Sequence, residues 1–387
     1  MSLTGPGASH GLRLGRAAPL AAVLTIGIIA RAILVPITHG ADFLVWDLAS
    51  RATLDGVNIY SHHPAYTGGP YAYLPLFLYI EVPMQWVAVH TGVSFTVMGK
   101  LPIVAADLAA TLLIVGEVRR RGLGSRVEAA AAALFFLNPL VLYNGAFYGR
   151  FDSVCVALFL LAFTAYRAGR PATWRFAVAY AFAIAAKTFP IFVLPWLVAR
   201  GRATALRVVV ACAAVVGVIS APYLLSSPHP FVRDLLYSAD RLPGGLSWQV
   251  IFHGLPAGVQ VSIGNALLGA FVLVAIALAL IDDFAVASVA AMLLFLVLSK
   301  QVIEQYLIWP LPLLALLAVD GGSRAALFLI VLLTAAGMLV NAYYHPFGLQ
   351  PAAINVAFAV LVSCAVARLL WAHRPGLHPP GPSSSEP

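Results

Sequence analysis

The sequence predicts an all-α polytopic membrane protein, and three observations support this fold class. Hydrophobic residues make up 61% of the 387-residue chain, charged residues make up 10%, and the mean hydropathy is +0.91. A soluble globular domain has roughly 45–50% apolar and about 25% charged residues. The apolar stretches are also long and continuous, whereas an outer-membrane barrel strand alternates apolar and polar residues. The composition therefore excludes a cytosolic enzyme, a disordered chain and a secreted disulfide scaffold.

About twelve apolar segments are long enough to cross a bilayer as helices. The first runs from about Leu20 to Ile37, and the others begin near Lys100, Val127, Phe151, Trp174, Phe189, Val208, Ile263, Phe284, Ile303, Ala325 and Ala352. The segments that begin at Trp174 and Phe189 are short and meet at Lys187-Thr188-Phe189-Pro190. A single kinked segment is the alternative there.

The stretch from Tyr73 to His90 is apolar, but we expect a bent interfacial helix rather than a span. It contains Pro75, Glu81 and Pro83, and a proline in mid-helix and a carboxylate in the bilayer are both costly. With this stretch outside the count, the positive-inside rule places most of the arginine clusters and both termini in the cytoplasm.

The chain then divides into three parts. These are a cytoplasmic head (1–16), a single transmembrane domain (17–374) and a Pro/Ser-rich tail (375–387) that is expected to be disordered. Two long segments, 38–99 and 222–260, lie on the extracytoplasmic side. The first also contains a second expected interfacial helix, from Phe43 to Leu54.

All three lysines of the chain, Lys100, Lys187 and Lys300, fall at predicted outer ends of spans, and Arg150 does too. The positive-inside rule disfavours basic residues there. Snorkelling toward headgroups or pairing with a carboxylate explains any one of them alone. Four converging cations also bind phosphate well, so a lipid phosphate or pyrophosphate is the expected ligand.

Several carboxylates lie on the same side, and each has a local alternative to a role in chemistry. Asp42 follows the first span and faces the boundary with water, but Asp is also a favoured helix N-cap. Asp107 serves a substrate or an internal basic partner. Asp152 orients a cation or caps the helix that it begins. Glu304 lies four residues after Lys300, so local pairing explains both.

Aromatic and hydrogen-bonding side chains are frequent in the predicted outer segments. They include Tyr60, Gln305 and Tyr306, and such a mixture suits a sugar, although an aromatic belt at the membrane interface is the alternative. The chain contains no P-loop, no Rossmann fingerprint and no nucleophile elbow. No cluster of Cys, His and carboxylate residues has metal-ligand spacing. The basic residues form short clusters between apolar segments, so no nucleic-acid partner is expected.

The sequence resembles the GT-C superfamily of polytopic glycosyltransferases, from about Ala41 to Pro312. It is most similar to the catalytic-subunit family of GPI mannosyltransferase I and its bacterial relatives. The matching motifs, in order, are Asp42-Phe43, Val45-Trp46-Asp47, Gly56-Val57-Asn58-Ile59-Tyr60, Tyr73-Leu74-Pro75-Leu76, Lys100-Leu101-Pro102, Ala106-Asp107-Leu108, Leu137-Asn138-Pro139, Tyr148-Gly149-Arg150-Phe151-Asp152-Ser153, Lys187-Thr188-Phe189-Pro190 and Gln305-Tyr306-Leu307-Ile308-Trp309-Pro310-Leu311-Pro312.

The resemblance implies a GT-C-like bundle and inverting transfer of a sugar, mannose, from a polyprenyl-phosphate or dolichyl-phosphate donor. An acidic residue in the first outer loop usually acts as the base, and Asp42 occupies that place. The sequence departs from the family pattern at two positions. The eukaryotic enzyme has an Asp-x-Asp motif in the first outer loop, whereas this chain has Ala41-Asp42 with no upstream acidic partner. Arg150 stands where many bacterial relatives have glutamine.

Such a transfer needs a base at the acceptor hydroxyl and positive charge at the departing phosphate. We expect Asp42 to be the base, with Asp47 as second choice. Lys300 and Arg150 hold the donor phosphate, and Lys187 and Lys100 support them. The side chains expected to orient these cations or to contact substrate are Asp107, Asp152, Glu304, Gln305, Tyr306 and Tyr60.

The donor lipid is a substrate, and no cofactor is expected; a divalent metal ion is possible but not strictly required, and no residue pattern supports one. The expected partners are a polyprenyl-phosphate sugar donor, a glycolipid or glycan acceptor, membrane lipids and, by resemblance, a small membrane subunit. The expected location is a bacterial cell membrane with the active site facing outward, or the endoplasmic reticulum lumen in a eukaryote. A secondary transporter or lipid-linked sugar flippase is the main alternative function, and a non-catalytic assembly subunit is another.

Overall fold

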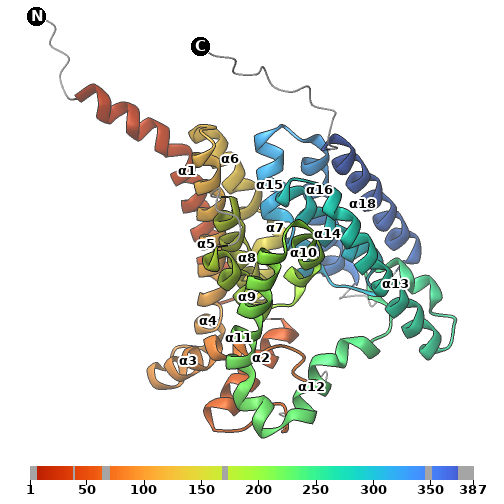
Figure 1. Cartoon of the computed structure of the whole chain (residues 1–387). Coiled ribbons are helices and arrows are strands. Elements are labelled where there is room, and N and C mark those ends of the chain that lie inside the picture. Colours follow the sequence, from red (N-terminus) through yellow and green to blue (C-terminus); the bar gives the residue numbers. More distant parts are fainter. Residues whose placement is uncertain (1–6, 38–39, 63–69, 168–172, 345–350, 374–387) are drawn as a thin grey trace, which may run out of the picture.

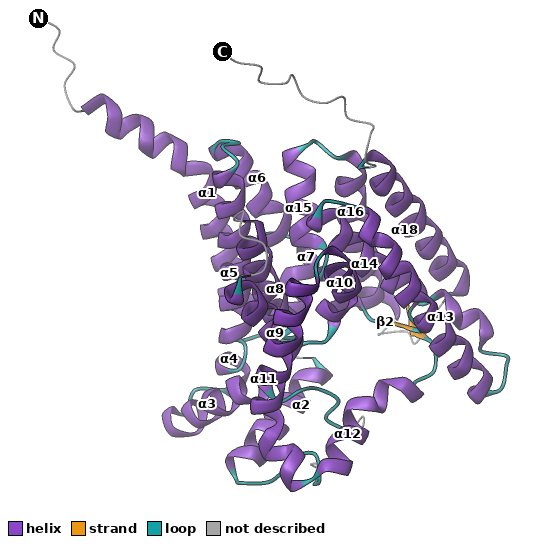
Figure 2. Cartoon of the chain, in the orientation of Figure 1, coloured by secondary structure: helices purple, strands orange, loops and turns teal. Residues whose placement is uncertain are grey.

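The computed structural model describes residues 7–37, 40–62, 70–167, 173–344 and 351–373. The predicted tail, 375–387, lies outside the described residues. The described chain is almost entirely helical, with one two-residue parallel ladder between β1 (Gly244–Gly245) and β2 (Gln301–Val302) (Figure 2). The predicted all-α fold class is confirmed.

The helices form a tall body with a separate group of helices at one end (Figure 1). The start of α1 and the end of α18 point toward the same end of the molecule, called here the upper end, but on opposite sides of it. Three helices lie at the opposite, lower end: α2 (Ala41–Leu54), α3 (Leu76–Thr91) and α12 (Pro228–Leu236). The body contains α1 (Gly7–Leu34), α5 (Leu101–Arg120), α6 (Ser125–Phe136), α8 (Asp152–Arg167), α9 (Trp174–Ala186), α10 (Leu194–Arg200), α11 (Arg202–Ser226), α13 (Ala257–Ala277), α14 (Phe284–Leu298), α15 (Leu311–Asp320), α16 (Arg324–Leu339) and α18 (Ala352–Ala372).

Five helical segments of the described chain are long and apolar enough to cross a membrane. They are Phe95–Arg120, Arg202–Ser226, Ala257–Leu280, Arg324–Ala342 and Ala352–Ala372. A sixth is added if the bent pair Ser125–Phe136 and Pro139–Phe147 forms one span. Other predicted spans coincide with apolar helices of 10–17 residues, so the predicted count of twelve is not confirmed.

Prolines and caps explain where several helices break. After α6, Asn138 accepts a hydrogen bond from the Leu140 backbone N–H at 2.9 Å, and Pro139 begins α7 (Pro139–Leu142). A proline is tolerated at the start of a helix but not in its interior, so the chain bends here by 48°. At the junction after α9, Lys187 is extended and the 3-10 helix η2 (Phe189–Val193) follows. The chain therefore breaks at the predicted junction, between two apolar helices that are each shorter than a span.

Both expected interfacial helices are present at the lower end. The helix expected from Phe43 to Leu54 is α2, and α3 forms within the stretch from Tyr73 to His90. The two helices pack against each other, and α3 is not among the helices with the length and composition of a span. The outer segment expected at 222–260 is shorter than predicted, because α11 continues through Pro222 to Ser226 and α13 begins at Ala257.

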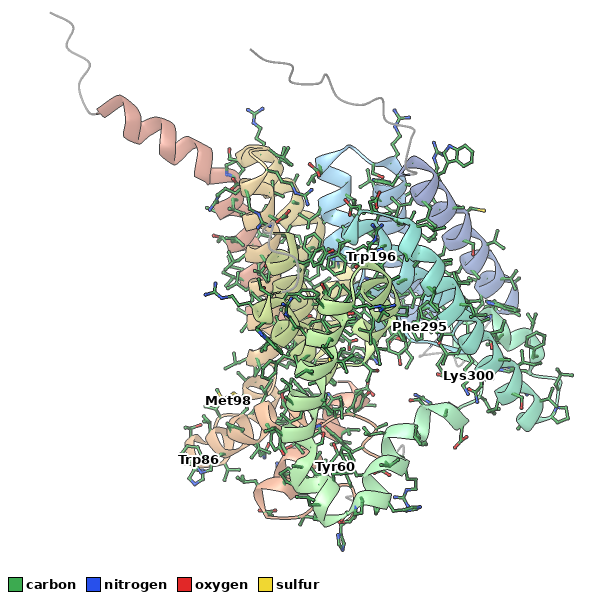
Figure 3. All side chains as sticks on the ribbon, in the orientation of Figure 1. Tyr60, Trp86, Met98, Trp196, Phe295 and Lys300 are labelled. Atoms are coloured by element: carbon green, nitrogen blue, oxygen red, sulfur yellow. The ribbon has the colours of Figure 1, made fainter. Side chains whose placement is uncertain are left out.

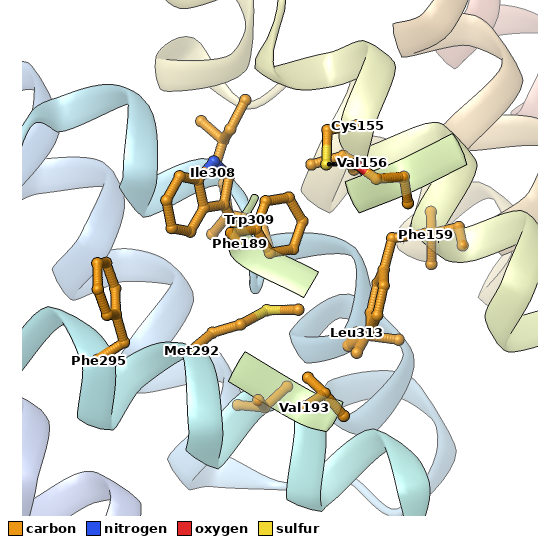
Figure 4. Packing of buried hydrophobic residues seen from close by; sticks show 14 of the residues in the cluster. Cys155, Val156, Phe159, Phe189, Val193, Met292, Phe295, Ile308, Trp309 and Leu313 are labelled. Carbon is orange, nitrogen blue, oxygen red and sulfur yellow. Dashed lines mark hydrogen bonds between the residues drawn. The ribbon is translucent and has the colours of Figure 1, made fainter. Parts of the chain in front are cut away.

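Aromatic packing joins the lower helices to the body. Trp46 of α2 lies edge-on against Tyr73, Phe77 and Phe151, at ring-centroid distances of 5.1, 5.7 and 5.0 Å. Deeper in the body, Phe189 stacks on Trp309 at 4.5 Å (Figure 4). Edge-on and offset-stacked aromatic pairs are favourable geometries, so these contacts hold α2 on the helix ends that it covers.

Candidate functional site

A cavity of about 640 Å³ lies where the lower helices meet the body. Its walls come from the start of α2, the segment 70–74, the end of α9 with η2, the 3-10 helix η3 (Tyr237–Asp240) and the 3-10 helix η6 (Glu304–Ile308). Charged groups on the lining are Asp42, Lys187 and Arg241. This is the size and character of a small-molecule site, with apolar walls and a few polar groups.

Asp42 lies in the first turn of α2 and is one of the cavity-lining residues. The N-cap of this helix is Gly40, and no side chain caps it, so the local alternative that Asp42 is the N-cap is wrong. Its Oδ2 instead accepts a hydrogen bond from Arg150 Nε at 2.9 Å. The Asp42 side chain is 39% exposed, so the carboxylate is oriented by a cation and still reaches the cavity.

Arg150 is buried beneath Asp42 and bridges two carboxylates. Its guanidinium donates to Asp42, to Glu304 and, at 3.2 Å, to Asn144 Oδ1. Gly149 precedes it with a φ of +78°, and a Cβ there would lie 2.3 Å from the Phe43 ring. Only glycine fits this left-handed, crowded position. The backbone at Gly149 therefore seats α2 and places Arg150 under Asp42.

Lys187 enters the cavity from the end of α9, where the helix breaks. Its Nζ donates to Asp152 Oδ2 at 2.7 Å, and Trp309 Nε1 donates to Oδ1 of the same carboxylate at 2.6 Å. Both Asp152 oxygens therefore bind side chains of other segments. The Nζ also lies 5.2 Å from the Phe151 ring centroid and 5.4 Å from that of Tyr306, within cation–π range.

Arg241 is a cavity-lining cation that we did not select from the sequence. It follows η3, and the described part of the chain offers it no carboxylate, only the Tyr237 ring at 5.8 Å. A basic residue in a predicted outer segment was the available clue, since the positive-inside rule disfavours it there. Tyr73 and Trp309 also line the cavity. Burial, and next the Asp42 carboxylate, raises the pKa of the Tyr73 hydroxyl well above its usual value, so the hydroxyl keeps its proton.

Two of the predicted phosphate-binding lysines are absent from the cavity lining. Lys100 is fully buried, and its Nζ donates to the carbonyl oxygens of Val35, Ala146 and Phe147 at 2.8–3.0 Å. Lys300 lies beside α13 (Figure 3) and donates to the Ala239 carbonyl and to Asn265 Oδ1. Both lysines join chain segments that are distant in sequence.

Three other predicted carboxylates serve internal pairs. Asp107 Oδ2 lies 2.9 Å from an Arg31 guanidinium nitrogen, and both side chains are buried, so the internal-partner alternative holds. Asp47 pairs with Arg51 one turn away at 3.2 Å and is not on the lining. The predicted local pair between Lys300 and Glu304 is wrong. Glu304 pairs with Arg150, because η6 turns its carboxylate toward the loop before α8.

Of the aromatic and amide side chains that were predicted to contact substrate, one lines the cavity and two do not. Tyr306 lines the cavity. Tyr60 does not; it is fully buried near the lower end, and its hydroxyl donates to the Tyr73 carbonyl at 2.7 Å (Figure 3). Gln305 is buried but absent from the lining. Among the described residues, no group of three His, Cys, Asp or Glu side chains is placed to hold a metal ion.

The architecture matches that of one solved structure. The crystal structure of ArnT from Cupriavidus metallidurans, bound to undecaprenyl phosphate, superposes with a TM-score of 0.51, covering 92% of this chain and 73% of that one, at 18% identity. The match shows that this chain has the polytopic helical fold of ArnT.

The chain belongs to glycosyltransferase family 87, whose model matches residues 71–303. GPI mannosyltransferase 1 from Gibberella zeae is 36% identical over 100 residues. That match covers 26% of this chain and only 20% of the fungal enzyme. The predicted resemblance to the GT-C superfamily is confirmed.

Proposed function

We propose that this protein transfers mannose from a polyprenyl-phosphate donor to a hydroxyl of a glycolipid or glycan acceptor on the extracytoplasmic side of the membrane. Family membership supports the glycosyl transfer. The undecaprenyl phosphate in the ArnT structure supports the donor class, and the name of the fungal relative supports the sugar. We assign the lower end, with its cavity and the helices α2 and α3, to the expected outer side.

The observation on which the proposal rests is the cavity that Asp42 shares with Lys187 and Arg241. In an inverting transfer, Asp42 accepts the proton of the acceptor hydroxyl as its oxygen bonds to the anomeric carbon. The bond between that carbon and the donor phosphate oxygen breaks on the opposite face. The phosphate leaves with an added negative charge, which nearby cations stabilise.

We assign the donor phosphate to Lys187 and Arg241, since these are the lysine and arginine on the lining. Arg150 acts through Asp42, which it orients, and Lys100 and Lys300 hold the surrounding chain. Apolar side chains on the lining, Phe192, Leu268 and Phe295, give the prenyl chain a path from the cavity toward lipid. The lipid-phosphate sugar is a substrate, and the mechanism uses no cofactor.

The test is transfer from purified polyprenyl-phosphate mannose by protein in detergent. General-base catalysis contributes roughly 10²–10⁴ in rate, so Asp42→Asn is expected to lower kcat by at least roughly 10². Asp47→Asn is the matched control, because it makes the same change on the same helix away from the cavity. Wild-type turnover by Asp42→Asn disproves the assignment, and faster transfer from polyprenyl-phosphate glucose disproves the sugar.

The same assay separates this function from transport by a secondary transporter or flippase. Transfer needs no closed compartment and proceeds in detergent, whereas transport requires a sealed vesicle. A non-catalytic assembly subunit would tolerate both Asp42→Asn and Lys187→Met without loss of mannose transfer by its complex.

A further inference from the structure

A second cavity, of about 460 Å³, lies at the upper end between α16 and α18, which pack against each other (Figure 1). Its lining consists of Arg324, Phe328, Leu361, Cys364 and Arg368 with two alanines. None of these residues lines the cavity that contains Asp42. The second cavity is therefore separate from the proposed transfer site.

Two arginines give this cavity its charge. Arg324 is the first residue of α16, and Arg368 lies in the C-terminal part of α18. Both are exposed, and the described residues provide neither with a carboxylate partner. A guanidinium stays charged and binds phosphate oxygens in a bidentate geometry. The N-terminal end of α16, a helix of 16 residues, adds a favourable dipole for an anion.

Below the arginines the lining is apolar. Phe328 and Leu361 are 45% and 43% exposed, on two helices that are long and apolar enough to cross the membrane. A ligand that fits this surface has an anionic head and a hydrocarbon chain. The end of α5 contains Arg119 and Arg120, and Arg121, which follows it, pairs with Asp320 at the end of α15, which agrees with the charge of a cytoplasmic surface.

We propose that the groove between α16 and α18 binds one anionic glycerophospholipid. The lipid phosphate lies between Arg324 and Arg368, and an acyl chain lies along Phe328 and Leu361. Basic pockets between membrane helices at the cytoplasmic face bind anionic headgroups in this way. The site binds a structural lipid and is independent of the transfer reaction.

Cys364 reports on occupancy because it lines the groove and is exposed, whereas Cys155 is buried and Cys212 is half-buried. The experiment uses the full chain with Cys155→Ser and Cys212→Ser, in nanodiscs of phosphatidylcholine with or without phosphatidylglycerol. The rate of Cys364 alkylation by an uncharged maleimide is measured across the phosphatidylglycerol series. Native mass spectrometry counts the phosphatidylglycerol molecules that remain bound.

We expect phosphatidylglycerol to slow alkylation. The double variant Arg324→Gln with Arg368→Gln should need roughly 30-fold more phosphatidylglycerol for equal protection. Each arginine near an anionic surface contributes about 1 kcal/mol to binding, and about 1.4 kcal/mol corresponds to a tenfold change in affinity. It should also retain one fewer lipid. Arg126→Gln, an exposed arginine at the start of α6, is the control for bulk surface charge and should leave both results unchanged. A second double variant, Arg324→Lys with Arg368→Lys, keeps both charges and should recover part of the protection.

Two results would overturn the proposal. One is equal protection in the Arg324/Arg368 double variant and in Arg126→Gln, which assigns the effect to bulk charge. The other is protection that is complete in pure phosphatidylcholine, which assigns the groove to another segment of the chain or to a neutral lipid. If the variant that combines Arg324→Gln with Arg368→Gln unfolds, the single variants Arg324→Gln and Arg368→Gln each remove one charge and are compared with Arg126→Gln in the same way.

Discussion

Arg150 Nε donates to Asp42 Oδ2 at 2.9 Å, joining residues that are 108 positions apart in the sequence. The same guanidinium donates to Glu304, whose side chain is fully buried. The proposed base is therefore not an isolated loop carboxylate. Its position depends on a cation that is itself fixed by a second acid from the other half of the chain.

This relationship predicts that Arg150→Gln loses both activity and stability. Breaking a buried ion pair by removal of one partner costs roughly 3–5 kcal/mol, because Glu304 is left charged without its cation. The double variant Arg150→Gln with Glu304→Gln removes that penalty and is expected to recover the free energy of unfolding. It should not recover kcat, because Asp42 is still without its partner. Wild-type kcat in a folded double variant would show that Arg150 does not orient the base.

Trp309→Phe is expected to weaken donor binding through Lys187. The substitution removes the N–H that binds Asp152 and keeps a ring against Phe189. A hydrogen bond to a charged group contributes about 1.5–3 kcal/mol, so the Asp152–Lys187 pair loses part of its fixed geometry. The expected result is a raised KM for the donor.

The control for this prediction is Trp248→Phe, which removes an indole hydrogen bond to the Val297 carbonyl outside the cavity. It should reduce stability without a change in donor KM. Equal donor KM values for Trp309→Phe and Trp248→Phe would show that the Trp309 hydrogen bond does not contribute to donor binding.

Arg241 and Lys300 are expected to act as one unit. Lys300 donates to the Ala239 carbonyl and β1 pairs with β2, so both contacts fix the chain on either side of Arg241. Arg241→Gln should raise the donor KM, and Lys300→Met should raise it by displacing Arg241. The combined variant should be no worse than Arg241→Gln alone, because coupled positions are not additive. Additive effects would indicate that Lys300 has a separate contact with the donor.

Glu81 of α3 makes stability depend on pH. Burial, and next the Asp47 carboxylate, raises the pKa of Glu81 well above its usual value, and neither of its oxygens has a hydrogen-bond partner in the described structure. The folded state therefore holds this proton at a pH where the unfolded state has released it. The contribution is fully present below the unfolded pKa of about 4.3 and is lost as the pH rises toward the folded pKa.

Glu81→Gln should consequently raise the free energy of unfolding at pH 8, by about 1 kcal/mol or more, and leave it nearly unchanged at pH 4. The control is Glu128→Gln, which makes the same change at a carboxylate paired with Arg119 at 2.8 Å. That variant should be less stable at pH 8. Chemical denaturation in detergent at both pH values measures the difference. A Glu81→Gln variant that is less stable at pH 8 would contradict the prediction.

Local chemistry in the sequence was sufficient to predict several features of the fold. The prolines and the carboxylate between Tyr73 and His90 predicted a helix that does not span, and α3 is not among the helices with the length and composition of a span. The junction at Lys187-Thr188-Phe189-Pro190 predicted a break, which the structure contains. These features depend on backbone geometry and on the cost of burying a charge, both of which are local.

The number of spans and the partners of the charged residues were not predictable in this way. Hydropathy measures apolar length but not where caps divide a segment, as at Asn138. A lysine at a helix end has the same local sequence whether it binds a phosphate or three carbonyl groups, and the carbonyls that Lys100 binds belong to residues at least 46 positions away. Likewise, only the folded chain shows that Asp107 belongs to Arg31.

The ion-pair network of Asp42, Arg150 and Glu304 also has a consequence for the synthesis and membrane insertion of the protein. A nascent chain synthesised as far as residue 300 already contains Asp42 and Arg150. It does not yet contain Glu304, which binds Arg150 and fixes its position. An incompletely inserted nascent polypeptide therefore has no assembled centre, and competence arises only after Glu304 has reached its place beside Arg150.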